Sequence, residues 1–117
     1  MNTLQRHLLA LFGELGLPVF LRGWVPAGQR RPYLTLELAL APPRERGTLV
    51  LRCYAPTEGG NALRLAWLDA LGKLIPPAGT VVAGLAVVRP GPTRLPGSPL
   101  DRDGVTAEAE LSVVRFG

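Results

Sequence analysis

The residues best suited to chemistry in this chain are a single histidine and a single cysteine, His7 and Cys53. A cysteine nucleophile needs a nearby base, access to solvent and a lowered thiol pKa. His7 falls on the polar side of an expected helix, whereas Cys53 falls on the inward side of an expected strand. We therefore expect Cys53 to be a small core residue, and with one cysteine the chain has no internal disulfide.

Two acidic pairs have spacings that also occur in metal sites and catalytic sites. Asp101 and Asp103, in the sequence DRDG, resemble the start of a calcium loop, but the next acidic residue is Glu108 and the other ligand positions are missing. Glu108 and Glu110 are two residues apart, so both carboxylates face the same side of a strand. A solvated outer sheet face predicts the same spacing, and we favour that interpretation. No residue pattern therefore points to an enzyme, a metal site or a cofactor.

Composition and charge are those of one ordinary globular domain. The chain has 117 residues, 47% apolar and 19% charged, which is enough for a single core across residues 1–117. The net charge is +4 and the sequence pI is near 10.2, but the arginines are scattered and form no nucleic-acid-binding arm. Neither a signal-peptide pattern nor an apolar run of bilayer length is present, so we expect synthesis in the cytoplasm and no membrane contact.

Hydrophobic periods predict two helices and about five strands. The helices are expected at residues 2–15, where Asn2 and Gln5 form a capping box, and at residues 61–75. The strands are expected at residues 19–24, 33–40, 48–55, 80–89 and 105–116. Because strands come in runs and do not strictly alternate with helices, we expect an α+β fold: a two-layer sandwich with a mainly antiparallel sheet.

Alternation of apolar and polar residues assigns the two faces of this sheet. Cys53 follows the inward period of its strand, whereas Glu37 and Arg52 lie on the outward period of adjacent strands. We expect Glu37 and Arg52 to pair across the outer face. Gly84, inside a valine-rich run, is expected to mark a bulge or a close backbone approach.

The expected central helix at residues 61–75 carries two apolar lines. One line is predicted to pack on the core and consists of Leu63, Ala66, Trp67, Ala70 and Leu74. The other falls nearly opposite and consists of Leu65, Leu68, Gly72 and Ile75. A surface helix of a monomer needs one apolar face, so we predict that the second line contacts another subunit.

Residues 90–104 are expected to form a long loop between the last two strands. The segment contains four prolines and follows neither helical nor strand periodicity. Loops of this length in a compact domain are usually functional or disordered. Its charges of both signs are predicted to contact a partner protein, and they are carried by Arg94, Asp101, Arg102 and Asp103. The alternative is a long, solvated hairpin tip.

The order of these elements, together with two sequence stretches, resembles a known protein family. The stretches are PYLTLEL before the first hairpin and LVLRCYAP leading into the central helix. An N-terminal helix precedes them, and a pair of strands separated by the long loop closes the chain. In this order and hydrophobic pattern the chain resembles the small tail-terminator and tail-completion proteins of long-tailed bacteriophages, often labelled minor capsid proteins. The resemblance extends over nearly the whole length.

This resemblance implies a structural virion protein, not an enzyme. Members of the family are α/β subunits that form rings, typically hexameric, on the end of the tail tube. The ring stops tube polymerisation and meets the head connector. The resemblance thus implies self-association, contact with the tail tube protein and the head–tail connector proteins, and DNA only as it passes through the ring. It also implies a place in the tail or neck of the virion, after assembly in the host cytoplasm, and no cofactor.

Two other functions stay open at the level of sequence. A head-completion or connector protein would share the phage context but dock on the portal side. A small intracellular enzyme or ligand-binding domain is compatible with the same fold, since a fold does not fix a function. A monomer with a deep polar pocket would favour the second of these.

Overall fold

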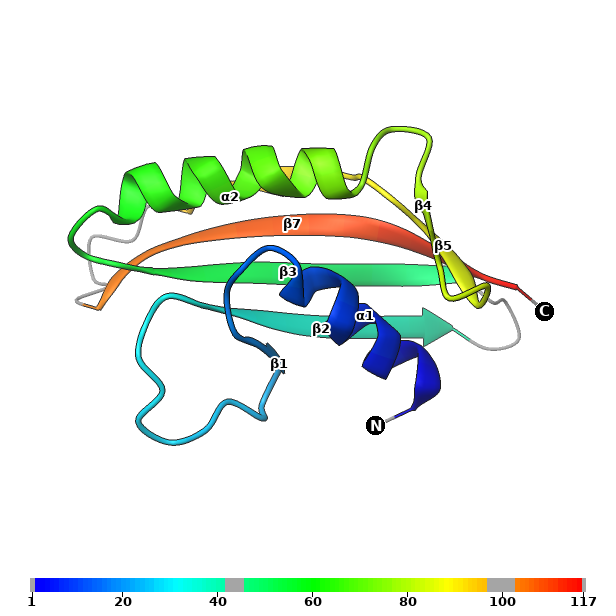
Figure 1. Cartoon of the computed structure of the whole chain (residues 1–117), viewed down its shortest axis with the longest axis horizontal. Coiled ribbons are helices and arrows are strands. Elements are labelled where there is room, and N and C mark those ends of the chain that lie inside the picture. The colour runs from blue at the N-terminus through cyan, green and yellow to red at the C-terminus, as the bar shows by residue number, and fades with distance from the viewer. Residues whose placement is uncertain (1, 42–45, 97–102, 117) are drawn as a thin grey trace.

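The computed structural model describes residues 2–41, 46–96 and 103–116, and it confirms the expected α+β class (Figure 1). These described parts contain two helices and seven strands. In chain order they are α1 (Thr3–Gly13), β1 (Val19–Leu21), β2 (Tyr33–Ala41), β3 (Arg46–Pro56), α2 (Gly60–Leu74), β4 (Thr80–Val82), β5 (Ala86–Arg89), β6 (Thr93–Arg94) and β7 (Gly104–Arg115).

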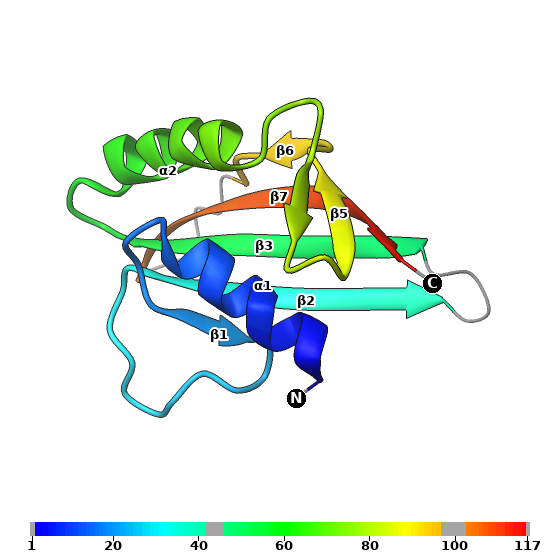
Figure 2. The ribbon, with the colours of Figure 1, turned by 45° about the vertical axis from the view of Figure 1, so that its right-hand side comes forward.

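The strands form one curled sheet in the order β1-β2-β3-β7-β5-β4, with β6 paired to β7. The β1–β2 pair is parallel and the other pairs are antiparallel. The sheet curls around the helices, and α1 contacts both β1 and β4, the two ends of the strand order (Figure 2). The expected sheet of about five strands is therefore wrong in strand number, and the sheet is mixed and curled where a plain sandwich was expected.

The additional strands come from segments that the hydrophobic pattern could not divide. Residues 80–89, expected as one strand, form the β4–β5 hairpin. Its turn lies at Ala83 and Gly84, with φ values of 51° and 68°, and the Leu85 N–H donates to the Val82 oxygen at 2.8 Å. Type I′ hairpin turns need positive φ at both central residues, which glycine adopts readily. Gly84 thus marks a turn, and the expected bulge or close approach at this position is wrong.

The core lies on the inner face of the long strands, as alternation predicted. Leu34 on β2 is opposite Cys53 on β3, and Cys53 is opposite Ala107 on β7. All three side chains are fully buried, which confirms the inward position of Cys53. The first helix adds buried Leu4, Leu8 and Phe12.

Local chemistry fixes the start of α1. The Gln5 N–H donates to Asn2 Oδ1 at 2.8 Å, and the Asn2 N–H donates to Gln5 Oε1 at 3.1 Å. These two bonds form the expected capping box and satisfy main-chain donors that a helix leaves unpaired. The helix ends at Gly13, two residues before the expected limit.

On the outer face, strand register decides which charges pair. Thr35, not Glu37, is opposite Arg52 on the β2 side, and Glu108 is opposite Arg52 on the β7 side. Arg52 therefore forms an ion pair with Glu108, at 3.3 Å. The Arg52 pKa is raised, first by its hydrogen bond to the Tyr54 hydroxyl and also by Glu108. Glu37 pairs with Arg22 instead, so the expected Glu37–Arg52 pair is wrong.

Candidate functional site: an apolar hollow beside α2

The buried side of α2 lies between the two apolar lines expected from the sequence. Trp67 and Leu71 are 4% and 5% exposed, and Ile75, the residue that caps the helix, is 1% exposed. Leu68 is half-buried, whereas Leu65 is 56% exposed. The prediction that Ile75 lies on a spare outer face is therefore wrong, and it holds only in part for Leu68. The reason is that the sheet and residues 90–93 both cover α2. Together they bury a wide arc of the helix surface.

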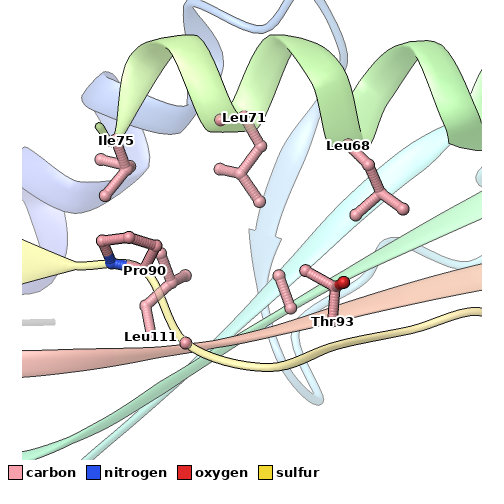
Figure 3. A pocket seen from close by; sticks show the side chains of 9 residues that line it. Leu68, Leu71, Ile75, Pro90, Thr93 and Leu111 are labelled. Atoms are coloured by element: carbon pink, nitrogen blue, oxygen red, sulfur yellow. The ribbon is translucent and has the colours of Figure 1, made fainter. Parts of the chain in front are cut away.

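A small apolar hollow of about 70 Å³ opens between α2 and the sheet. In Figure 3 the side chains of Leu68, Leu71 and Ile75 point down from α2, and Pro90, Thr93 and Leu111 lie below them. The complete lining is Leu68, Leu71, Gly72, Ile75, Pro90, Gly91, Thr93, Ala109 and Leu111. We call this space the α2 hollow. Three of the four residues predicted for a subunit interface therefore line one cavity.

A β-bulge forms one wall of the α2 hollow. Arg89 on β5 is opposite Ser112 and Thr93 on β6 is opposite Ala109, so the β5–β6 side has one residue more than β7. The extra residue lies within the Pro90–Gly91–Pro92 stretch. A Cβ atom on Gly91 would lie 2.3 Å from the main-chain oxygen of Glu110, so only glycine fits at this approach.

The same pairing changes the interpretation of the predicted contact loop. Residues 90–96 follow the edge of β7 and are not a free loop. Arg94 is exposed on β6, opposite Glu108, and Asp103 is exposed just before β7. Asp101 and Arg102 lie outside the described residues. The structure therefore places Arg94 on a sheet edge and Asp103 at the far end of the segment.

Arg64 joins α2 to β7 and to the segment that follows β6. Its Nη1 donates to the Thr106 oxygen on β7 at 2.9 Å and to the Pro96 oxygen at 3.3 Å. Leu65, the residue after Arg64, is 56% exposed, and Leu95, the residue before Pro96, is 43% exposed. Neither Arg64 nor Leu95 was among the site residues predicted from the sequence. Arg64 lies beside an apolar line of the expected helix, and Leu95 lies in the long segment that was predicted to contact a partner.

A second apolar feature lies at the opposite edge of the sheet. A pocket of about 230 Å³ opens beside β1 and is lined by Leu9, Val19, Phe20, Leu21 and Trp24. We call it the β1 pocket. Trp24 is 77% exposed, the highest value among the exposed large hydrophobic residues in the described part of the chain. Since β1 begins the strand order and β6 lies on the far edge of β7, the two apolar features lie on opposite edges.

The outer face also carries a polar pocket of about 450 Å³. Gln29, Arg30, Arg31, Tyr33, Pro56 and Asp103 line it. Tyr33 stacks on Tyr54 with ring centroids 4.8 Å apart, and the Arg31 guanidinium lies 5.3 Å from the Tyr54 ring centroid. Arg31 also donates to the Ala55 oxygen at 3.2 Å. The Arg31 guanidinium thus already forms contacts within the protein.

The residues first considered for chemistry lie in unrelated surroundings. His7 is exposed on α1, whereas Cys53 is fully buried on β3. Burial raises the pKa of the Cys53 thiol to about 11, which disfavours a thiolate. Within residues 2–41, 46–96 and 103–116, no three His, Cys, Asp or Glu side chains come together as a metal site would need. Over the same residues, neither helix has the length and apolar character needed to cross a bilayer.

Comparison with known proteins defines the class of fold. A solved structure of a protein of unstated function matches this chain with a TM-score of 0.60 and 17% sequence identity. The match covers 99% of this chain and 98% of the other. At this identity the likeness shows a shared α+β fold over the whole chain. No protein-family model and no curated protein matches the sequence.

Proposed function

We propose that this chain is a structural virion protein, a bacteriophage tail terminator that forms a homo-oligomeric ring, typically hexameric, on the end of the tail tube. The ring stops tube polymerisation and joins the tail to the head connector proteins, and DNA passes through it. The ring acts in the tail or neck of the virion and assembles in the host cytoplasm. The family resemblance supplies this role, and the placement of apolar surface on the subunit supports it.

The observation that carries the proposal is the pair of apolar features on opposite edges of the sheet. A closed ring needs a heterologous contact, in which one patch of a subunit meets a different patch of the next subunit. The α2 hollow with Leu65 and Leu95 provides one patch, and the β1 pocket with Trp24 provides another. Leu65, Leu68 and Gly72 supply the α2 side of the first patch, whereas Ile75 contributes only through the floor of the hollow.

Exposed apolar side chains on both patches also favour self-association. Trp24, Leu65 and Leu95 are 77%, 56% and 43% exposed, and clustered apolar surface of this kind often marks an interaction site.

Native mass spectrometry and electron microscopy with purified tail tubes test this function. We expect rings that cap the tube ends, and we expect Leu65→Asp or Leu95→Asp to reduce ring formation without loss of the fold. Val81→Asp is the matched control, because Val81 is 61% exposed on β4 and lines neither the α2 hollow nor the β1 pocket. Rings that bind only the head connector would reassign the protein to head completion. Monomers alone, with bare tube ends, would refute the proposal.

Arg94, Asp101, Arg102 and Asp103 are proposed to contact a partner outside the subunit, which is either the tail tube or connector or an adjacent subunit. Because Arg94 belongs to the sheet edge, the sharper test changes only charges near the far end of the segment. Replacing Asp101, Arg102 and Asp103 with serine should leave the subunit folded and its rings intact. We then expect fewer capped tubes, and unchanged capping would refute the contact.

The polar pocket favours a second candidate, a small ligand-binding domain. Arg30 and Gln29 border a space of about 450 Å³, large enough for a small polar molecule. This candidate predicts a monomer in which a polar metabolite shifts the amide resonances of Gln29, Arg30, Arg31 and Tyr33. Assembly into rings with no such shifts would leave the structural function alone.

A further inference from the structure

The edge of β6 that faces away from β7 has open hydrogen-bonding groups. The Glu110 N–H donates to the Pro92 oxygen at 2.9 Å, so Thr93 and Ala109 form a non-hydrogen-bonded antiparallel pair. The main-chain groups of Thr93 and Leu95 therefore point away from β7. No other hydrogen bond uses these groups within the described residues, and both residues are exposed. Pro92 and Pro96 limit this free edge to a few residues, because proline has no N–H.

The edge of β1 that faces away from β2 is open in the same way. The Leu34 N–H donates to the Pro18 oxygen and the Arg22 N–H donates to the Leu36 oxygen. In a parallel pair of strands, every second residue forms its main-chain hydrogen bonds to the neighbouring strand. Pro18 and Arg22 bond β2, so Val19 and Leu21 direct their main-chain groups away from β2. The Leu21 oxygen accepts from the Trp24 N–H. Among the described residues, the Val19 N–H, the Val19 oxygen and the Leu21 N–H have no hydrogen-bond partner, so they are open to another strand.

The side chains of these two edges face the same side of the sheet. Thr93 lines the α2 hollow, on the inner face with Ala109. Val19 and Leu21 are opposite the buried residues Leu34 and Leu36, so they also face inward. Directly opposed residues in an antiparallel pair place their side chains on one face. The two free edges therefore match in length. On both edges every second residue has open main-chain groups, and the side chains of these residues lie on the inner face of the sheet.

The strand directions also agree with closure of a ring. Successive pairings make β1 and β2 run one way and β6 the opposite way within one subunit. A rotation about an axis along the strands keeps these directions, so the β1 of the next copy would lie antiparallel to β6. A heterologous contact repeated by such a rotation closes into a ring.

Building on the proposed function, we propose that the subunits join by strand addition, with the β6 edge of one copy pairing antiparallel with the β1 edge of the next. The second copy is the occupant because one chain carries both matching edges. In this register Thr93 is opposite Leu21 and Leu95 is opposite Val19. The Leu21 side chain then lies at the mouth of the α2 hollow, whose volume of about 70 Å³ suits an aliphatic tip. Leu95 enters the β1 pocket, which has about 230 Å³.

The outer face of this junction is complementary as well. In the same register Arg94 of one copy is opposite Phe20 of the next. A guanidinium over an aromatic ring is a favourable pair. These two residues form a non-hydrogen-bonded pair, in which the side chains approach most closely. They are therefore the best positions for a disulfide that reports the contact.

The test combines Arg94→Cys and Phe20→Cys in one chain under mild oxidation. Cys53 is fully buried and does not compete for cross-linking. We expect a ladder of dimers and larger species on a non-reducing gel. Each single variant should stay monomeric on the gel, and a mixture of the two singles should give dimers without a ladder, because the contact is head-to-tail. The control pair Arg94→Cys with Val81→Cys should give no ladder.

A proline substitution tests the hydrogen bonds separately. Leu95→Pro removes an N–H that faces the next copy and breaks no hydrogen bond within the subunit, whereas Leu95→Ala keeps that N–H. We expect Leu95→Pro to weaken association roughly five- to tenfold more than Leu95→Ala does. Rings by native mass spectrometry without the Arg94–Phe20 cross-link would refute strand addition and keep the ring. Cross-linked single variants would show a symmetric contact and also refute it. Folded monomers that never cross-link would overturn both proposals.

Discussion

Arg64 on α2 donates a hydrogen bond from Nη1 to the main-chain oxygen of Thr106 on β7, at 2.9 Å. The same nitrogen lies 3.3 Å from the Pro96 oxygen. One guanidinium thus joins the central helix, the last long strand and the segment that follows β6. Arginine suits this position because its planar fork supplies several donors and its aliphatic stem packs on apolar surface. Ala109 on β7 and Thr93, on the strand that leads to Pro96, both line the α2 hollow.

Arg64→Met should lower the free energy of unfolding by about 1.5–3 kcal/mol. The variant keeps most of the aliphatic stem but loses both hydrogen bonds from the charged group. Lys73→Met on the same helix is the control, since Lys73 and Asp69 form a well-exposed pair worth less than about 1 kcal/mol. Urea unfolding monitored by tryptophan fluorescence measures both. Equal effects of the two substitutions would contradict a structural role for Arg64.

Two glycines that border the hollow should respond to alanine in opposite directions. Gly91→Ala should destabilise the fold by about 1–3 kcal/mol, because its Cβ would lie 2.3 Å from the Glu110 oxygen. Gly72→Ala should stabilise it by about 0.5–1 kcal/mol, because Gly72 lies inside α2 and nothing is within 4 Å of its Cβ position. Thermal unfolding of the two variants gives the signs directly. A stabilising Gly91→Ala would mean that the bulge is wrongly placed.

Truncation of Ile75 and Leu65 should separate the inner and outer sides of α2. Ile75 is 1% exposed, so Ile75→Ala should cost about 2–5 kcal/mol through lost packing and a larger cavity. Leu65 is 56% exposed, so Leu65→Ala should change the stability of the monomer by less than about 0.5 kcal/mol. Denaturant titrations at low protein concentration keep association from contributing. Similar losses in the two variants would restore Ile75 to the outer face.

The stability of the fold should fall in alkaline solution because of Cys53. Burial raises the thiol pKa from 9.0 to about 11, so the unfolded chain loses this proton at a lower pH than the folded chain. Stability from this group is complete below about pH 9 and is lost as the pH rises towards 11. The loss should reach roughly 2 kcal/mol near pH 10.5. Cys53→Ala should remove this part of the pH dependence, as urea unfolding at pH 8 and pH 10.5 would show.

The sequence by itself determined the elements whose burial follows a local period. Alternation along β2, β3 and β7 identified the inner face of the sheet and placed Cys53 in the core. The capping box of Asn2 and Gln5 was also readable, because both hydrogen bonds join residues within one turn. Such features depend on neighbours in the chain, so a single sequence carries the information.

Tertiary structure alone decided the shape of the candidate site. Which arc of α2 is buried depends on two layers that cover it, the sheet and residues 90–93, and the helical period does not reveal the second layer. The one-residue shift between Arg89 and Thr93 along β7 arises from long-range pairing, and it converts an expected loop into a bulged sheet edge. Arg64 likewise finds its acceptors on segments distant in sequence. The α2 hollow exists only where α2, residues 90–93 and β7 meet, because each of the three contributes one wall.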